Sequence, residues 1–287
     1  MPNKFYLQKS GGLGDVMWSY FYHDQSYARA YQNLIKKIKK DQPDCHLCFI
    51  SCTNNTQVKQ FYETNKFIDE LIVLPMSEWV NNTWTAHLEG KQSLLDYNGI
   101  YKDESATDVV REFNLTQDEQ EEFIRIRNMG KFVVLHPCGG CITRSLLHNN
   151  FDLKLLIELI CACNYKCVIV GGNDNKTTNF YNQSVVCDNA GCINLIDRYT
   201  CRLHSALSAS CDFFLGVGSC FSVISAIFNI KSFLFYPKNL KWWIDGEPPQ
   251  KGVDVISQKF RQNKTKVEYM ECLSNNLDEL VFDFLLQ

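Results

Sequence analysis

The chain has 287 residues, enough for one large domain or two small ones, and 45% of them are hydrophobic, which predicts packed cores. The formal net charge is only −3 with Lys and Arg scattered along the chain, so the composition lacks the footprint of a nucleic-acid binder. No signal peptide follows Met1 and no apolar run is long enough to cross a bilayer, so we expect a cytoplasmic protein.

The first half is expected to alternate strands with helices. The predicted strands are residues 5–8, 46–51 and 70–74, and the predicted helices are 15–40, 57–65 and 103–127. Four lysines at 36, 37, 39 and 40 are interpreted as a solvated helix face rather than a phosphate or membrane patch. Residues 75–101 show no clear pattern.

The second half repeats this alternation more clearly. The predicted strands are 132–136, 166–170, 193–195, 212–215 and 232–236, and the predicted helices are 152–163, 177–184, 200–210, 221–228 and 276–286. Such alternation predicts a parallel sheet with ligands at its carboxyl edge. Two strand–glycine loop–helix units in one chain therefore suggest an α/β protein with two Rossmann-like domains facing each other across a cleft.

The 14 cysteines are expected to be reduced thiols that pack as small hydrophobic residues. Cys45-x-x-Cys48 and Cys138-x-x-Cys141 have the spacing of zinc ligands, but residues three apart in a strand point to opposite faces. Core packing is therefore favoured over zinc binding or redox chemistry.

The first glycine loop, with Gly12 and Gly14, does not match a dinucleotide site. Met17 stands where the third glycine of that motif belongs, and no acidic residue ends the second strand. Asp15 begins the next helix and has two open interpretations. It is a first-turn acid stabilised by the helix dipole, or a carboxylate in the cleft that accepts a proton from a hydroxyl.

The second glycine loop, Gly139-Gly140, is followed by Arg144, whose planar fork suits the oxygens of a diphosphate. A solvated loop arginine is the alternative. Just before this loop, His136 ends a strand, where a lone histidine is more often a structural hydrogen bonder than a catalyst. The pair Trp242-Trp243 is predicted to line a sugar or base site, or equally to form a hydrophobic latch.

A third turn, Gly216-Val217-Gly218-Ser219, joins a strand to an apolar helix. Ser219 and Ser222 can cap that helix, and its free N–H groups can hold a phosphate. An ordinary capped turn is the competing interpretation. Two glycines at the carboxyl end of a parallel strand favour the phosphate.

Together these motifs resemble the lipopolysaccharide heptosyltransferases of glycosyltransferase family 9. The resemblance rests on residues 11–17, 133–140, 168–174, 194–200 and 213–222, and it covers 129–240 well and the first 35 residues moderately. It implies the GT-B fold, with an acceptor-binding domain at 1–128 and a nucleotide-sugar-binding domain at 129–268. Residues 269–287 would form a helix that packs back on the first domain.

One departure from the family bears on the sugar. The family's last turn carries Asp-Thr-Gly and then a histidine, where this chain has Val217-Gly218-Ser219 and Ser222. A heptose donor and a lipopolysaccharide acceptor are therefore not carried over, whereas the fold and the reaction type are.

The resemblance implies an inverting glycosyltransferase that moves a sugar from a nucleoside-diphosphate sugar to a hydroxyl of a glycan or glycoconjugate, whose location could bring the protein to a membrane surface. Asp15 would accept the proton, and Arg144 would stabilise the leaving diphosphate. The implied donor-binding residues are Gly12, Gly14, His136, Gly139, Gly140, Gly171, Gly172, Asn173, Gly216, Gly218, Ser219 and Ser222.

No Asp-x-Asp motif is present, so we expect no divalent metal and no cofactor. Two other functions stay open. A sugar-nucleotide 2-epimerase shares the two-domain architecture but needs more acids and histidines in the cleft. A non-catalytic sugar-nucleotide or glycan-binding protein would explain Ser222 in place of the family's histidine.

Overall fold

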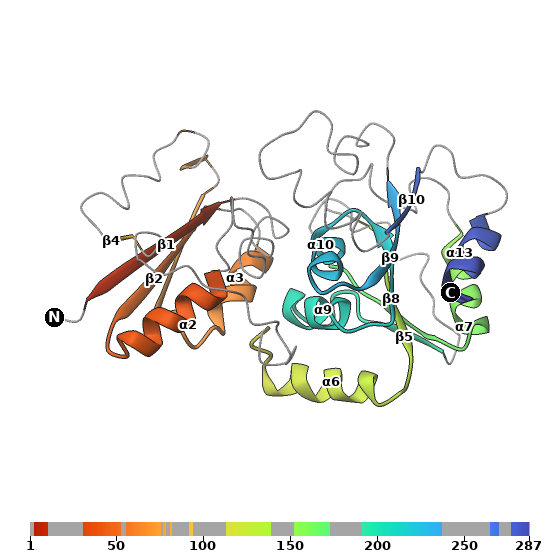
Figure 1. Cartoon of the computed structure of the whole chain (residues 1–287), viewed down its shortest axis with the longest axis horizontal. Helices are drawn as coiled ribbons and strands as arrows, with labels where there is room; N and C mark the ends of the chain where they lie inside the picture. Colours follow the sequence, from red (N-terminus) through yellow and green to blue (C-terminus); the bar gives the residue numbers. More distant parts are fainter. Residues whose placement is uncertain are drawn as a thin grey trace. The chain divides into compact units, whose positions relative to one another are not determined.

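The computed structural model of the chain describes residues 3–10, 31–52, 56–75, 77–78, 81, 92–93, 113–138, 152–172, 191–236, 265–269 and 277–286 (Figure 1). The chain divides into two compact units, Met1–Thr116 and Gln117–Gln287. Each unit has its own sheet, and all strand pairs found among the described residues are parallel. The predicted class, α/β with two parallel sheets, is therefore confirmed.

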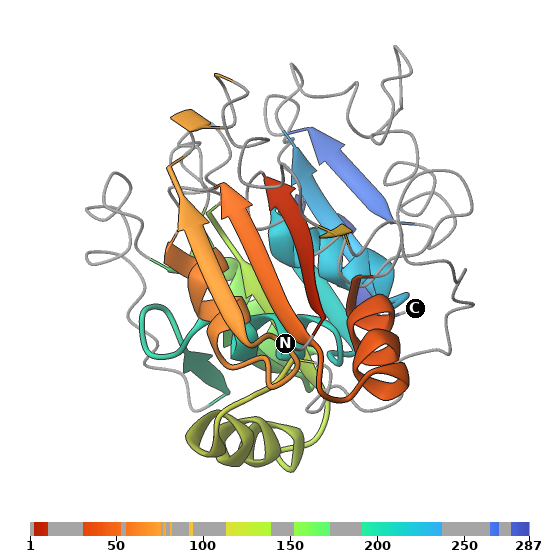
Figure 2. The ribbon, with the colours of Figure 1, turned by 90° about the vertical axis from the view of Figure 1, so that its left-hand side faces the viewer.

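The sheet of the first unit has the strand order β3-β2-β1-β4. Its three long strands lie side by side and point the same way in Figure 2. Their bounds are β1 Lys4–Ser10, β2 His46–Cys52 and β3 Glu70–Leu74, with the short β4 at Gln92–Ser93 and the helices α2 Tyr31–Asp41 and α3 Thr56–Glu63.

Apolar residues occupy both faces of this first sheet, as is typical of parallel sheets. The consecutive residues Phe5, Tyr6 and Leu7 are all buried, although neighbours in a strand point to opposite faces. On one face, Tyr62 of α3 stacks on Phe49 with ring centroids 4.1 Å apart. The near-continuous apolar runs that predicted these strands are therefore explained by burial on two sides.

The second unit holds a sheet of strand order β10-β9-β8-β5-β6-β7. In Figure 1, α9 and α10 lie on one face of this sheet, and α7 and α13 lie on the other. The bounds are α6 Gln117–Arg127, β5 Phe132–His136, α7 Leu153–Ala162, β6 Lys166–Ile169, β7 Cys192–Asn194, α9 Cys201–Ser208, β8 Phe213–Val217, α10 Cys220–Ile227, β9 Lys231–Tyr236, β10 Lys266–Tyr269 and α13 Leu277–Leu286.

The last helix, α13, packs in the core of the second unit, and its expected packing on the N-terminal domain stays a prediction. Its buried residues Val281, Phe284 and Leu285 belong to the same apolar core as strands β5, β8 and β9. Phe284 meets the rings of Phe213 and Phe233 at centroid distances of 5.2 and 5.4 Å. The physical reason is that the sheet face beside α7 offers aromatic surface that α13 buries.

The second unit begins at α6, before the domain boundary expected after residue 128. Glu119 of α6 forms a buried ion pair with Arg202 of α9, with Arg202 Nε 3.1 Å from Glu119 Oε2. The hydroxyl of Thr200, the N-cap of α9, donates to the same carboxylate. A buried charge is costly to separate from its partner, so this contact ties α6 to the second unit.

Candidate functional site

Seven of the predicted site residues lie in the described part of the chain, and the second unit contains all of them. They are His136, Gly171, Gly172, Gly216, Gly218, Ser219 and Ser222. They follow or end strands β5, β6 and β8, which are neighbours in one parallel sheet. The structure therefore brings them to the carboxyl edge, where parallel sheets bind ligands. The other predicted residues, Gly12, Gly14, Asp15, Gly139, Gly140, Arg144 and Asn173, lie outside the described residues.

His136 ends β5 and its imidazole is buried against the first turn of α10. The ring is 4% exposed and lies edge-on to Phe221, with centroids 4.9 Å apart. Its Nδ1 atom is buried and has no hydrogen-bond partner among the residues that the structure describes. Burial lowers the pKa of His136 to about 3, and the nearby His204 adds to the effect. The imidazole is therefore neutral at physiological pH and offers a hydrogen bond rather than a charge.

Gly216 and Gly171 are glycines for reasons that the backbone explains by itself. A Cβ atom on Gly216 would lie 2.4 Å from the carbonyl oxygen of His136, its partner on the neighbouring strand. Gly171 has a φ of +147°, which side chains other than glycine rarely tolerate. Both residues shape the edge of the sheet, and neither requires a ligand to account for it.

The N-terminal turn of α10 is already capped by its own serines. The hydroxyl of Ser219 accepts hydrogen bonds from the N–H groups of Phe221, at 3.2 Å, and of Ser222. This is a capping box, in which two residues satisfy each other's unpaired backbone groups. The expectation that this turn offers free N–H groups is therefore wrong for Phe221 and Ser222, because the Ser219 hydroxyl takes them.

Ser222 is fully buried and its hydroxyl is used within the turn. It accepts the N–H of Ser219 at 2.9 Å and donates to the Ser219 carbonyl at 2.8 Å. Behind it, Ser225 donates to the Ser222 carbonyl at 2.8 Å and meets Ser232 Oγ at 3.1 Å. The side chain of Ser222 can therefore act in binding only indirectly, through the backbone that it holds.

Backbone hydrogen bonds join the segments that follow β6 and β7 at the carboxyl edge of the sheet. The N–H of Leu195 donates to the Ile169 carbonyl at 2.9 Å, and the N–H of Asp197 reaches the Gly171 carbonyl at 3.5 Å. His204 of α9 meets the Leu195 carbonyl at 3.1 Å through Nε2. These contacts fix the start of the β7–α9 connection beside the predicted glycines.

A hollow of about 700 Å³ lies between α6 and the β7–α9 connection. None of the predicted site residues lines it. Its wall includes Arg198 and Tyr199, and its Arg125 is held by Glu122 at 2.6 and 2.7 Å. No sequence pattern predicted this hollow, because a charged helix face is typical of solvated surface and the facing strand is only three residues long.

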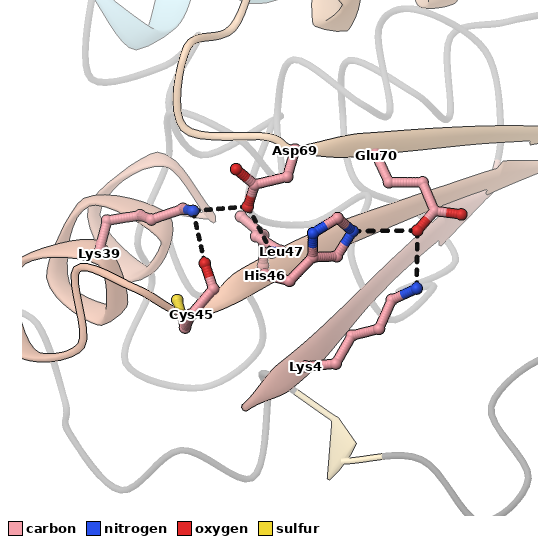
Figure 3. Close-up of polar contacts among 7 residues, drawn as sticks. All are labelled: Lys4, Lys39, Cys45, His46, Leu47, Asp69 and Glu70. Carbon is pink, nitrogen blue, oxygen red and sulfur yellow. Dashed lines mark hydrogen bonds and ion pairs between the residues drawn. The ribbon is translucent and has the colours of Figure 1, made fainter. Parts of the chain in front are cut away.

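A polar cluster lies at the amino edge of the sheet in the first unit, where its strands begin. Lys4, His46 and Glu70 are the first residues of β1, β2 and β3, and the Lys4 and His46 nitrogens lie 2.8 and 3.1 Å from Glu70 Oε2 (Figure 3). The hydrogen bond from Lys4 holds the pKa of Glu70 below its usual value, and His46 adds to this. These residues occupy the amino edge, so they pin the strands rather than bind ligands.

The lysine run on α2 is not entirely solvated. Lys39 forms an ion pair with Asp69 and donates to the Cys45 carbonyl at 2.8 Å (Figure 3). Asp69 also accepts the N–H of Leu47 at 2.6 Å. Burial alone would raise the pKa of Asp69, but these two donors hold it below its usual value. Lys39 therefore anchors α2 to β2 and is not available for a phosphate.

Nine of the described cysteines are free thiols, and six of these are buried: Cys45, Cys48, Cys138, Cys167, Cys201 and Cys211. Burial raises the pKa of the Cys167, Cys201 and Cys211 thiols, so they pack as hydrophobic residues. Cys192 departs from the expectation of reduced thiols, because it is disulfide-bonded; it lies on the edge strand β7, half-buried against the core of the second unit.

Metal ligands do not gather in the parts of the chain that the structure describes. No three His, Cys, Asp or Glu side chains there are close enough together to hold a metal ion. None of the helices in the described ranges is long and apolar enough to cross a membrane.

Comparison with known proteins finds its matches among solved structures. No protein-family model and no curated protein matches the sequence. The chain is similar to the ADP-heptose lipopolysaccharide heptosyltransferase II of E. coli, with a TM-score of 0.52, 12% identity and 99% of each chain covered. It is also similar to the E. coli heptosyltransferase WaaC with ADP, with a TM-score of 0.50, 10% identity, and 98% of this chain and 97% of that chain covered. The chain therefore shares the α/β GT-B fold of these heptosyltransferases over nearly its whole length.

Proposed function

We propose that this chain is an inverting glycosyltransferase that moves a sugar from a nucleoside-diphosphate sugar to a hydroxyl of a glycan or glycoconjugate. The observation that carries the proposal is the shared fold, which extends over 99% of this chain and 99% of an ADP-heptose heptosyltransferase. One fold can host many functions, so the activity depends on the residues of the site.

The second unit is the proposed donor side. Support comes from the gathering of His136, Gly171 and Gly218 at one carboxyl edge, next to the N-terminus of α10. Backbone N–H groups at such a position favour anionic oxygens. The WaaC structure that this chain resembles holds ADP, a nucleoside diphosphate of the class proposed here. Because His136 is neutral, the positive charge facing a diphosphate would come from Arg144.

The proposed reaction is a direct displacement. Asp15 takes the proton from the acceptor hydroxyl while the oxygen of that hydroxyl bonds to the anomeric carbon. The bond from that carbon to the diphosphate oxygen breaks, and the diphosphate leaves with the bonding electron pair. Arg144 and backbone N–H groups stabilise the leaving charge, so no divalent metal is required. The roles of Asp15 and Arg144 are assigned from their sequence motifs together with the family resemblance, and the proposed cytoplasmic location comes from the sequence alone.

The test is donor turnover by the full chain and by Asp15→Asn. The wild type should release nucleoside diphosphate from its sugar donor, and Asp15→Asn should be slower by about 10²- to 10⁴-fold, the usual contribution of a general base. Asp278→Asn, on the exposed face of α13, is the matched control and should turn over like the wild type. Donor binding without turnover, with many acceptors offered, would instead establish the non-catalytic binding protein.

A further inference from the structure

The Ser219 hydroxyl occupies the position that an anionic oxygen would need. Its oxygen accepts from the N–H groups of Phe221 and Ser222 at the N-terminus of α10. These are the groups that a helix N-terminus offers to a phosphate. A phosphate oxygen and the Ser219 hydroxyl therefore compete for the same two donors.

The backbone of the turn is held independently of that hydroxyl. Ser222 bonds both the N–H and the carbonyl of Ser219, and it is itself held by Ser225 from within the core. Ser222 and Ser225 are fully buried, whereas Ser219 is half-buried. Rotation about one side-chain bond of Ser219 would release the two N–H groups from its hydroxyl, while the bonds from Ser222 to the Ser219 backbone do not depend on that hydroxyl.

A separate feature beside this turn points to a ligand. The imidazole of His136 is buried against Phe221, and its Nδ1 atom has no hydrogen-bond partner. Buried polar atoms are almost always hydrogen-bonded, so one that is not requires an explanation. Because the His136 ring contacts Phe221 in the first turn of α10, a molecule that completed this hydrogen bond would lie close to that turn.

We propose that the Ser219 hydroxyl is a displaceable cap that holds the place of a donor phosphate oxygen and so lowers the affinity for the nucleoside diphosphate. This inference rests on the proposed function, because it names what competes with the donor at that same site. When the diphosphate binds, the Ser219 hydroxyl rotates away, and the N–H groups of Phe221 and Ser222 donate to a phosphate oxygen instead. The strength of the cap then sets the affinity.

The experiment is isothermal titration of the full chain with UDP, GDP, ADP, CMP and dTDP in turn, for the wild type, Ser219→Ala and Ser219→Gly. Removing an N-cap hydroxyl should tighten binding of the preferred nucleotide by about fivefold, the typical strength of such a cap. Glycine is well tolerated at an N-cap, so Ser219→Gly serves if Ser219→Ala does not fold.

The matched control is Ser210→Ala. The Ser210 hydroxyl donates to the Ala206 and Leu207 carbonyls at the C-terminal end of α9, away from the carboxyl edge. The Ser210→Ala variant should therefore bind the nucleotide with the affinity of the wild type. If the wild type binds a nucleotide and the Ser219 variants bind it no more tightly, the proposal of a displaceable cap is overturned and the proposed function is not. Absence of nucleotide binding in every variant and in the wild type would overturn the proposed function with it.

Discussion

His136 and His204 are both buried as neutral imidazoles. Burial lowers the pKa of His136 to about 3 and that of His204 to about 4, whereas a histidine in the unfolded chain has a pKa of about 6.5. Below pH 6.5 the unfolded chain therefore binds protons that the folded chain does not. The stability from each histidine is complete above pH 6.5 and decreases as the pH falls toward the folded pKa.

We expect each of these histidines to lower the free energy of unfolding by about 2 kcal/mol between pH 7.5 and pH 5. His136→Gln should remove one such contribution, so its stability should fall less steeply than that of the wild type over this range. Urea unfolding at the two pH values measures the difference. Equal losses in the variant and the wild type would show that His136 is protonated in the folded chain.

Gly216 is predicted to tolerate no side chain. Gly216→Ala would place a Cβ atom against the backbone carbonyl of His136, which cannot move without disturbing the pairing of β5 with β8. Overpacking of this kind costs about 1–3 kcal/mol. Chemical denaturation should show that loss, and an alanine variant as stable as the wild type would contradict the close approach.

The sequence predicted which residues lie at the ends of the strands better than it predicted what those residues do. Glycine after a strand was interpreted as a ligand turn, whereas Gly216 and Gly171 also have purely steric reasons. Ser219 and Ser222 were correctly predicted to cap α10. The consequence, that the cap occupies the N–H groups assigned to a phosphate, depends on side-chain rotamers, which a sequence pattern does not specify.

Among the elements, α6 depends on a buried ion pair. Glu119→Gln would leave the Arg202 guanidinium buried without a counter-charge, at a cost of about 3–5 kcal/mol. Glu158→Gln is the control, because Glu158 and Lys154 are exposed and 4.0 Å apart, and its loss should be within about 0.5 kcal/mol. Thermal unfolding of both variants would reveal equal, small losses if α6 were not anchored.

The docking of α13 predicts a sharp difference between two of its own phenylalanines. Phe284 is 5% exposed in the core of the second unit, and Phe282 is 38% exposed. Phe284→Ala should cost about 3–5 kcal/mol, and Phe282→Ala far less. Chemical denaturation measures both, and a larger loss for Phe282→Ala would place the helix on another surface.

Most described elements follow from the apolar pattern. The predicted bounds of β3 and β5 match the structure, and those of α7, α9 and α10 differ by one or two residues. The strand β10 escaped prediction because Lys266–Tyr269 is short and half polar, as suits an edge strand. The placement of α13 escaped it because an amphipathic pattern shows that a helix buries one face but not which surface covers it.

At the scale of the whole molecule, the fold was predictable and the site was only partly so. Strands that alternate with helices fix parallel sheets, and glycine turns after neighbouring strands gather at one edge. The proposed pairing of Asp15 as the base with Arg144 as the diphosphate-binding residue stays a prediction from sequence motifs and the family resemblance, since both residues lie outside the described ranges. The hollow beside α6 had no sequence signal because its lining residues come from distant segments.

The proposed function requires that this fold binds a nucleoside diphosphate without a metal ion. The most direct measurement is the thermal stability of the full chain with UDP, GDP, ADP, CMP or dTDP and their common sugars, each with and without EDTA. A ligand at a hundred times its dissociation constant should add about 2.7 kcal/mol to the free energy of unfolding. We predict that one nucleotide raises the melting temperature equally with and without EDTA. No shift with any of them, or a shift that EDTA abolishes, would contradict the claim.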